Sequence, residues 1–232
     1  TARISRPGNK ALITASGNLI SMSEDVGNGN GGKIETRLKM LNDGGTVFPG
    51  GDSIRIEKAN SVIILLTAST DYFASDPSAR SEERLEKVSA RPFAEIRNDH
   101  AADYKSYFDR LSIDLGSSDG NYFPTDARIT AMQNGYDDTD LVELYYQFGR
   151  YLLISSSRPG NLPANLQGIW ADGLNPPWSA DYHININIQM NYWPAEITNL
   201  GELALPFADF IDAMRPSAGR TASEVYGLKG IV

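Results

Sequence analysis

Two kinds of hydrophobic pattern divide the sequence. Residues 1 to about 75 contain short alternating or aliphatic runs separated by glycine-rich turns, which predicts β-strands. We expect strands at residues 11–13, 34–41, 46–47, 53–57 and 61–68. An independent β-sandwich commonly has about seven strands. This region is therefore predicted to be only the C-terminal part of a β-sandwich domain.

The rest of the chain has mainly helical spacing. Residues 75–89 are polar and charged, which predicts a linker, and apolar side chains then recur every three or four positions. Helices are expected over residues 92–110, from Asp140 to a stop at Pro159, from Pro206 towards Pro216, and over residues 217–226 with Gly227 as C-cap. Asp140 and Glu143 are spaced as a capping pair. A short alternation at residues 111–115 is typical of a strand.

Residues 182–192 alternate without error between apolar and polar side chains, which indicates an extended segment with two different faces. The polar positions are His183, Asn185, Asn187, Gln189 and Asn191. The simplest interpretation is an amphipathic strand with a solvated face. Asparagine is depleted in strands, however, so this row of amides indicates that the polar face has a role beyond solubility. A helix starting at Asn187 is a further alternative, which the alternation cannot decide.

Composition excludes several classes of function. The 232 residues carry a net charge of −8 without a basic cluster, which argues against binding to nucleic acid or to an anionic membrane surface. The absence of cysteine excludes disulfides and thiol chemistry. The longest aliphatic run, residues 62–66, is too short to cross a bilayer, so no membrane insertion is expected. We expect no cofactor and no metal.

The segment of residues 161–194 contains the strongest chemical signal. It holds all three tryptophans, one of the two histidines and a dense set of side-chain amides, while Asp172 and Asp181 are the only side chains in it that are expected to be ionised at neutral pH. Sugars have apolar faces that lie against indole rings, and hydroxyls that pair with amide donors and acceptors. A neutral carbohydrate is therefore the first ligand class. Trp178, in a Pro-Pro-Trp turn, is the predicted aromatic residue of the pocket rim.

The remaining candidate residues have simpler interpretations. Trp170 and Trp193 are predicted to pack in the core, and His100 to be a packed or surface histidine on a helix. Asp172 and Asp181 are typical of turns. Glu196 and Glu202 are typical of helix starts and surfaces, and no pair of carboxylates stands out. The chain taken alone therefore lacks an obvious acid and base for hydrolysis.

Several stretches resemble glycoside hydrolase family 95, the inverting 1,2-α-L-fucosidases and their α-L-galactosidase relatives. The resemblance rests on NLPANLQGIW and PPWSADYHININIQMNYWPAEITNLGEL, and extends through LYYQFGRYLLISSSRPG and PTDARI. It implies a multidomain α and β protein. The expected divisions are residues 1–75 as the end of an N-terminal β-sandwich, 76–123 as a linker with a helix, and 124–232 as the first helices of an incomplete (α/α)6 barrel.

The same resemblance implies roles for individual residues. Asn185 and Asn187 match the two family asparagines that hold the nucleophilic water, and His183 matches a position that contacts the sugar. A bulky imidazole near C5 would accept the methyl group of fucose and crowd a hydroxymethyl group. The general-acid Glu and a partner Asp of the family are expected past residue 232. The implied partners are a fucosylated glycan and the remainder of the same polypeptide.

Three alternatives stay open from the sequence. The protein could bind carbohydrate without cleaving it, because the same amides and indoles serve either purpose. It could have α-L-galactosidase specificity, or be a purely structural β-plus-helical module. Sequence past residue 232 would separate the first alternative from an enzyme, because hydrolysis needs the missing acid.

Overall fold

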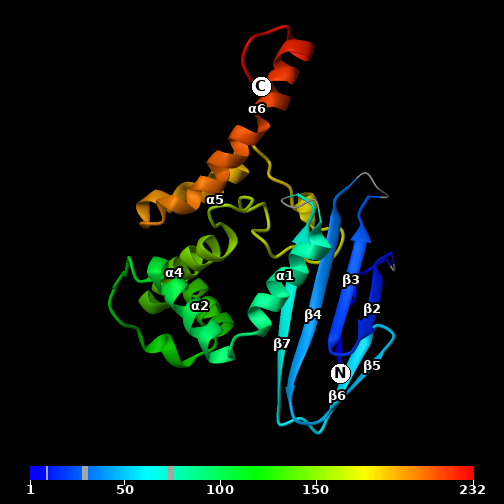
Figure 1. Ribbon diagram of the computed structural model, residues 1–232. Coiled ribbons are helices and arrows are strands. Elements are labelled where there is room, and N and C mark those ends of the chain that lie inside the picture. Colours follow the sequence, from blue (N-terminus) through cyan, green and yellow to red (C-terminus); the bar gives the residue numbers. More distant parts are fainter. Residues whose placement is uncertain (9, 28–30, 73–75) are drawn as a thin grey trace. The chain divides into compact units, whose positions relative to one another are not determined.

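The computed structural model describes residues 1–8, 10–27, 31–72 and 76–232 (Figure 1). The chain forms two compact units, Thr1–His100 and Ala101–Val232. In the first unit the strands are β1 (Ala2–Arg3), β2 (Leu12–Ser16), β3 (Leu19–Asp25), β4 (Lys33–Asp43), β5 (Thr46–Gly50), β6 (Ser53–Glu57) and β7 (Ser61–Thr70). Helix α1 (Pro77–Ser89) follows them, and α2 (Phe93–Phe108) crosses from the first unit into the second.

The strands form two antiparallel sheets. One has the order β2-β3-β4-β7 and the other β1-β6-β5. Ile20 of β3 lies opposite Leu38 of β4, and both pack in one cluster with Met40 and with Ile54 of β6. Because this cluster draws side chains from both sheets, the sheets face each other across it. The prediction of β-sandwich structure is confirmed in this form.

The sequence underestimated the number of strands. The described residues contain seven strands where about five were expected, and β1 and β3 were missed. In β3 the inward positions Ile20 and Met22 are buried, but serines follow each of them, at positions 21 and 23. So few apolar residues give a weak strand signal. The predicted boundary at residue 75 lies outside the described residues.

The segment predicted as a polar linker contains helix α1. The Asp76 side chain accepts hydrogen bonds from the backbone N–H groups of Ser78 and Ala79, at 2.9 and 3.0 Å, and so caps the helix. Leu85 is buried, and Thr67 of β7 donates to the backbone oxygen of Ser81 at 3.3 Å. In Figure 1, α1 accordingly runs beside β7 and β4. Its one buried leucine explains why composition alone predicted no packing.

The second unit is helical. It contains η1 (Asp119–Tyr122), α3 (Thr125–Gln133), α4 (Thr139–Ser156), η2 (Pro177–Ala180), α5 (Asn187–Ile197), η3 (Gly201–Ala204) and α6 (Leu205–Tyr226). Residues 111–115 form no strand. The two helices predicted after Pro206 are one continuous helix, α6, which contains Pro216. Gly227 caps it in the left-handed conformation, φ 63°, as predicted.

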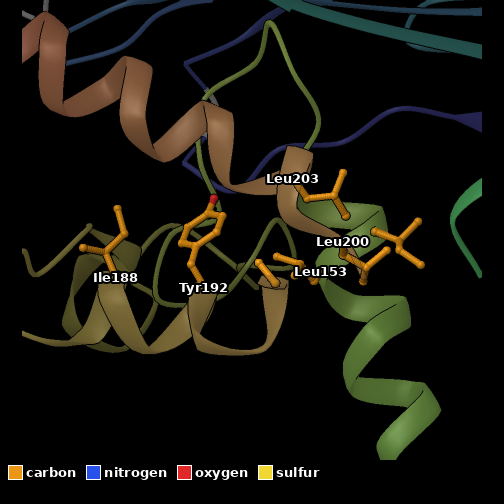
Figure 2. Close-up of a cluster of buried hydrophobic side chains, with 7 residues drawn as sticks. Leu153, Ile188, Tyr192, Leu200 and Leu203 are labelled. Carbon is orange, nitrogen blue, oxygen red and sulfur yellow. The ribbon is translucent and has the colours of Figure 1, made fainter. Parts of the chain in front are cut away.

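A buried cluster joins α4, α5 and η3 in this unit. Figure 2 shows Leu153 of α4 and Ile188 and Tyr192 of α5 together with Leu200 and Leu203. Each fully buried aliphatic side chain contributes about 1.5–3 kcal/mol to folding. The cluster therefore fixes one face of α5, the helix that carries the amide-rich segment.

A buried ion pair fixes the start of α4. Arg128 of α3 donates to both carboxylate oxygens of Asp138, at 2.8 and 2.7 Å. Asp138 also accepts from Leu141 N at 3.0 Å and is therefore the N-cap of α4, so the predicted capping pair of Asp140 and Glu143 is wrong. The hydrogen bonds from Arg128 hold the pKa of Asp138 well below its usual range. None of the helices in residues 76–232 and the other described ranges combines the length and the apolar composition of a membrane-spanning segment.

Candidate functional site

The alternating segment does not form the predicted strand. Residues 184–186 form a turn and α5 begins at Asn187, so the extended prediction is wrong from residue 184 onward and the alternative helix start at Asn187 is confirmed. No described strand pairs with this segment, and a helix satisfies the backbone polar groups internally. Within α5, Ile188 is 1% exposed and Tyr192 7%, whereas Met190 between them is 47% exposed. The burial of side chains in this segment therefore has helical spacing and does not alternate.

The two asparagines assigned to the water site lie on either side of this transition. Asn185 is exposed within the turn, and Asn187 is the half-buried first residue of α5. They do not share a strand face. The helix start lacks a side-chain cap, and the N–H of Ile188 donates to the backbone oxygen of His183 at 3.4 Å. The role of the two asparagines in holding the water stays a prediction.

His183 and Trp178 lie together. Their ring centroids are 5.7 Å apart, and the rings meet edge to face at 87°. The Nδ1 atom of His183 lies against an Asp181 carboxylate oxygen, which also accepts from His183 N at 3.2 Å. The indole of Trp178 is 76% exposed. A half-buried imidazole beside a largely exposed indole is a suitable wall for a ligand with an apolar face.

The backbone around these two residues is strained. Trp178, Ser179, Ala180 and His183 have φ angles of 53°, 58°, 49° and 38°, in the left-handed region that residues other than glycine rarely adopt. Such conformations persist only where the surrounding structure imposes them, and they cluster at functional sites. The turn that presents Trp178 and His183 is therefore a candidate site on backbone grounds as well as on side-chain chemistry.

A loop preceding this turn is tied to both the turn and α5. Leu166 N donates to Asp181 O at 3.1 Å. The side-chain nitrogen of Asn191, on α5, donates to the backbone oxygens of Ala164 and Asn165 at 3.2 and 3.1 Å. The loop around residues 164–168 is thus held next to the candidate residues. Sequence reasoning grouped Asn191 with the polar face and missed this role.

Tyr192 adds a buried polar anchor to the same loop. Its hydroxyl accepts from Ala164 N at 2.9 Å and lies 2.8 Å from Ser157 Oγ. Since Ser157 Oγ donates to Leu203 O at 2.9 Å, the Tyr192 hydroxyl donates to Ser157. Burial raises the pKa of Tyr192, which keeps the phenol protonated for this arrangement.

The other two tryptophans contradict the prediction that they belong to the core. Trp193 is 62% exposed and Trp170 is 46% exposed. Trp170 lines a cavity of about 370 Å³ together with Asn165, Gln167 and Asn191. The hydrophobic neighbours of Trp170 and Trp193 in sequence suggested packing, but neighbours in sequence do not report which face of a turn or helix is covered.

The carboxylates considered from the sequence do not form an acid and base pair. Arg110 pairs with Glu202 at 2.6 Å and lowers the pKa of that carboxyl, opposite to the change that favours a general acid. Asp172 and Glu196 are exposed, and Asp181 faces His183. His100 is exposed on α2, which confirms the surface interpretation.

Comparison with known proteins assigns the family. The glycosyl hydrolase family 95 catalytic domain matches residues 92–232. Alpha-L-fucosidase 2 of Arabidopsis thaliana is 36% identical over 208 residues, which cover 84% of this chain and 25% of that protein. Probable alpha-fucosidase A of Aspergillus niger is 32% identical over 188 residues, covering 74% of this chain and 23% of that protein. The protein of the same name from Aspergillus oryzae is 35% identical over 175 residues, covering 72% and 24% respectively.

These matches extend across both compact units, and the chain spans about a quarter of the length of the curated relatives. The family domain covers more than half of the 232 residues, including all of the candidate site. The tryptophan-rich and amide-rich turn described above lies within the matched region. The chain belongs to glycosyl hydrolase family 95.

Proposed function

We propose that the protein containing this chain is a glycoside hydrolase that releases terminal α1,2-linked L-fucose from glycans with inversion at the anomeric carbon. Support comes from the family and from the relatives named as α-fucosidases. The amide-rich and aromatic surroundings of residues 178–191, in which Asp181 is the one acidic residue, suit a sugar. In this proposal a fucosylated glycan is the substrate.

Inversion requires a base that activates water on one face of the sugar and an acid that protonates the leaving oxygen on the other. The side-chain oxygens of Asn185 and Asn187 accept hydrogen bonds from that water. A carboxylate bound to the amide N–H groups polarises them and makes the oxygens better acceptors. The acid Glu and the partner Asp come from polypeptide outside residues 1–232. Glu202 is unsuited, because Arg110 stabilises its ionised form.

The observation that carries this proposal is the position of Asn187 at the first residue of α5. Ile188, the next residue, and Tyr192 are buried in the cluster with Leu153 and Leu200, so the helix start is held rigidly from its opposite side. A rigid helix end keeps a catalytic amide in place more precisely than a loop does. Asn185 lies in the adjoining turn, close to the same helix end.

His183 sets the sugar preference in this proposal. Edge-to-face contact with Trp178 and the neighbouring Asp181 carboxylate both restrict its imidazole. A fixed imidazole near C5 accepts the methyl group of fucose and crowds the hydroxymethyl group of L-galactose. His183→Thr is expected to raise activity on L-galactosides relative to fucosides. An unchanged ratio would remove His183 from the specificity assignment.

The helical unit is proposed as part of a larger barrel. Helices α3 to α6 would form the opening of an (α/α)6 barrel over residues 124–232, with 76–123 as the connection to the β-sandwich. Leu144, Tyr145 and Phe148 leave one side of α4 apolar and exposed, which suits a helix that packs against further helices. Limited proteolysis of the full gene product tests the divisions at residues 75 and 123.

The direct test is turnover of a fucosyl α1,2-linked trisaccharide by the full gene product and its Asn187→Asp variant. We expect kcat to fall by roughly 10²–10⁴, the usual contribution of proton transfer, while KM changes little. Asp is favoured at a helix N-terminus, so the variant should keep the fold. Asn187→Gly should show the same loss. Unaltered kcat in both variants would exclude the assigned role.

A wild-type protein that binds the trisaccharide without releasing fucose would point to the non-catalytic alternative. Calorimetric titration with the intact trisaccharide makes that distinction. If the protein is a hydrolase, the Asn187→Asp variant should bind the intact trisaccharide about as tightly as the wild type binds the reaction products at the same sugar positions. Binding without cleavage by the wild type would contradict the proposed activity.

A further inference from the structure

A cavity of about 370 Å³ adjoins the candidate site and has no part in the proposed water activation. It is lined by α4, by the loop of residues 164–170 and by α5. Its volume is within the range of small-molecule pockets, roughly 300–1,000 Å³. Every residue that lines it is uncharged, so it suits a neutral ligand rather than an ion.

An indole ring is held in position on the wall of this cavity. The Trp170 ring lies close to the ring of Tyr151, with centroids 6.5 Å apart. It also lies against Gly168, where an added Cβ would be 2.7 Å from the indole Cζ3 atom. Gly168 has a φ of 65°, which favours glycine independently. The turn is therefore built to keep a half-exposed indole at this place.

Amides with unused hydrogen-bonding groups surround the indole. The side-chain nitrogen of Asn191 donates to backbone oxygens of the loop, and Asn165 Oδ1 accepts from Gln167 N at 2.8 Å. Within the described part of the chain, no hydrogen bond uses the side-chain amide of Gln167, the side-chain nitrogen of Asn165 or the side-chain oxygen of Asn191. Donors and acceptors for hydroxyl groups thus remain on the wall beside the aromatic ring.

The cavity lies close to the residues of the proposed reaction. Asn191 follows Asn187 by one turn of α5, about 6 Å along the helix axis. The loop that carries Trp170 is also bonded to the turn of His183, through Leu166 N and Asp181 O at 3.1 Å. A saccharide of two or three rings can therefore reach both places at once.

We propose that this cavity is the subsite for the sugars to which fucose is attached. The apolar face of one sugar lies on the Trp170 indole, and its hydroxyls pair with Gln167, Asn165 and Asn191. This assignment rests on the proposed fucosidase function and extends it to the remainder of the glycan. The leaving saccharide is thereby held while the bond to fucose breaks.

The test compares two substrates in the full gene product. One is lactose carrying α1,2-linked fucose, and the other is 4-nitrophenyl α-L-fucoside, which lacks the additional sugars. Trp170→Ala should raise KM for the fucosylated lactose by roughly 3- to 10-fold, as expected for one aromatic contact, and leave KM for the aryl fucoside unchanged. Gly168→Ala should act in the same direction by displacing the ring, and Trp170→Phe should restore part of the affinity.

Trp193→Ala is the matched control, because Trp193 is exposed on α5 and does not line the cavity. It should leave KM for both substrates unchanged. If Trp170→Ala changes KM equally for the two substrates, or changes it for neither, the subsite is overturned. A structure in which another segment of the polypeptide fills the cavity would also overturn it. If the wild type releases no fucose, the proposed function fails separately. In that case, titration of the wild type and of Trp170→Ala with lactose tests the subsite by itself. Binding that depends on Trp170 supports the subsite, and absent binding overturns it.

Discussion

Strand β6 and residues 182–192 share an alternating sequence pattern but adopt different structures. In β6, Ile54 and Ile56 alternate with polar residues, and the strand pairs with β1 on one side and β5 on the other. Residues 182–192 instead form a turn and the start of α5. Alternation shows that two faces differ, but a strand also needs neighbouring strands to satisfy its backbone.

The first prediction tests whether the burial of side chains at the start of α5 is that of a helix or that of an alternating strand. Ile188→Ala should lower the free energy of unfolding by about 2–5 kcal/mol, because Ile188 lies in the core cluster. Ile184→Ala and Met190→Ala should change it by no more than about 0.5 kcal/mol, since both residues are exposed. Urea unfolding of the full gene product measures all three. Equal losses at positions 184, 188 and 190 would favour the alternating strand.

The second prediction compares ion pairs in the two compact units. The pKa of Asp138 is depressed by Arg128, so the stability from this buried pair is present above about pH 4, the value for an unfolded Asp, and is lost as the pH falls below it. Asp138→Asn should be less stable at pH 7 and should show a flatter decline between about pH 5 and pH 2.

Asp52→Asn is the control for this acid titration. Asp52 pairs with Arg3 in the β unit, and both side chains are largely exposed, so the pair should contribute little. Thermal unfolding followed across this pH range compares the two variants with the wild type. The same acid profile for Asp138→Asn and wild type would show that the buried pair does not govern acid stability.

The third prediction concerns the polar anchor of the candidate loop. Tyr192→Phe removes the hydroxyl that accepts from Ala164 N and donates to Ser157. Leaving these buried groups unpaired should lower the free energy of unfolding by about 1–3 kcal/mol. Tyr145→Phe is the matched control, because Tyr145 is exposed on the neighbouring helix α4. Chemical denaturation with an equal effect for both substitutions would contradict the network.

The smallest effect is expected at the helix starts. Asp76→Ala removes the side-chain cap of α1 and should lower the free energy of unfolding by about 1 kcal/mol. Ile186 occupies the corresponding position of α5 and has no cap to lose, so Ile186→Ala should change stability by about 0.5 kcal/mol at most. A larger loss at Ile186 than at Asp76, measured by urea unfolding, would show that burial outweighs capping there.

Much of the β unit could be predicted from the sequence because its strands carry their own signal. The aliphatic run of β7 and the alternation of β6 identify both strands, whereas the serines of β3 weaken its pattern. Helix α1 was not predicted from the polar residues 75–89, although Asp76 and Pro77 begin it. A capping residue followed by proline was the signal available there.

The candidate site was only partly predictable. The composition of residues 161–194 predicted a carbohydrate ligand, and the resemblance nominated Asn185, Asn187 and His183. The contact between His183 and Trp178 depends on left-handed backbone at residues 178–180, which no residue type there requires. The exposure of Trp170 depends on a cavity formed by α4, α5 and a loop. Such contacts between segments are set by packing and leave no local pattern.

The most direct measurement is the anomer of fucose first released by the full gene product. Proton NMR during the first minutes of hydrolysis distinguishes the two anomers before they interconvert. Direct attack by a water held at Asn185 and Asn187 inverts the anomeric carbon, so an α-linked substrate should first give β-L-fucose. Initial release of α-L-fucose would indicate a covalent intermediate and would contradict the assignment of these amides to the attacking water.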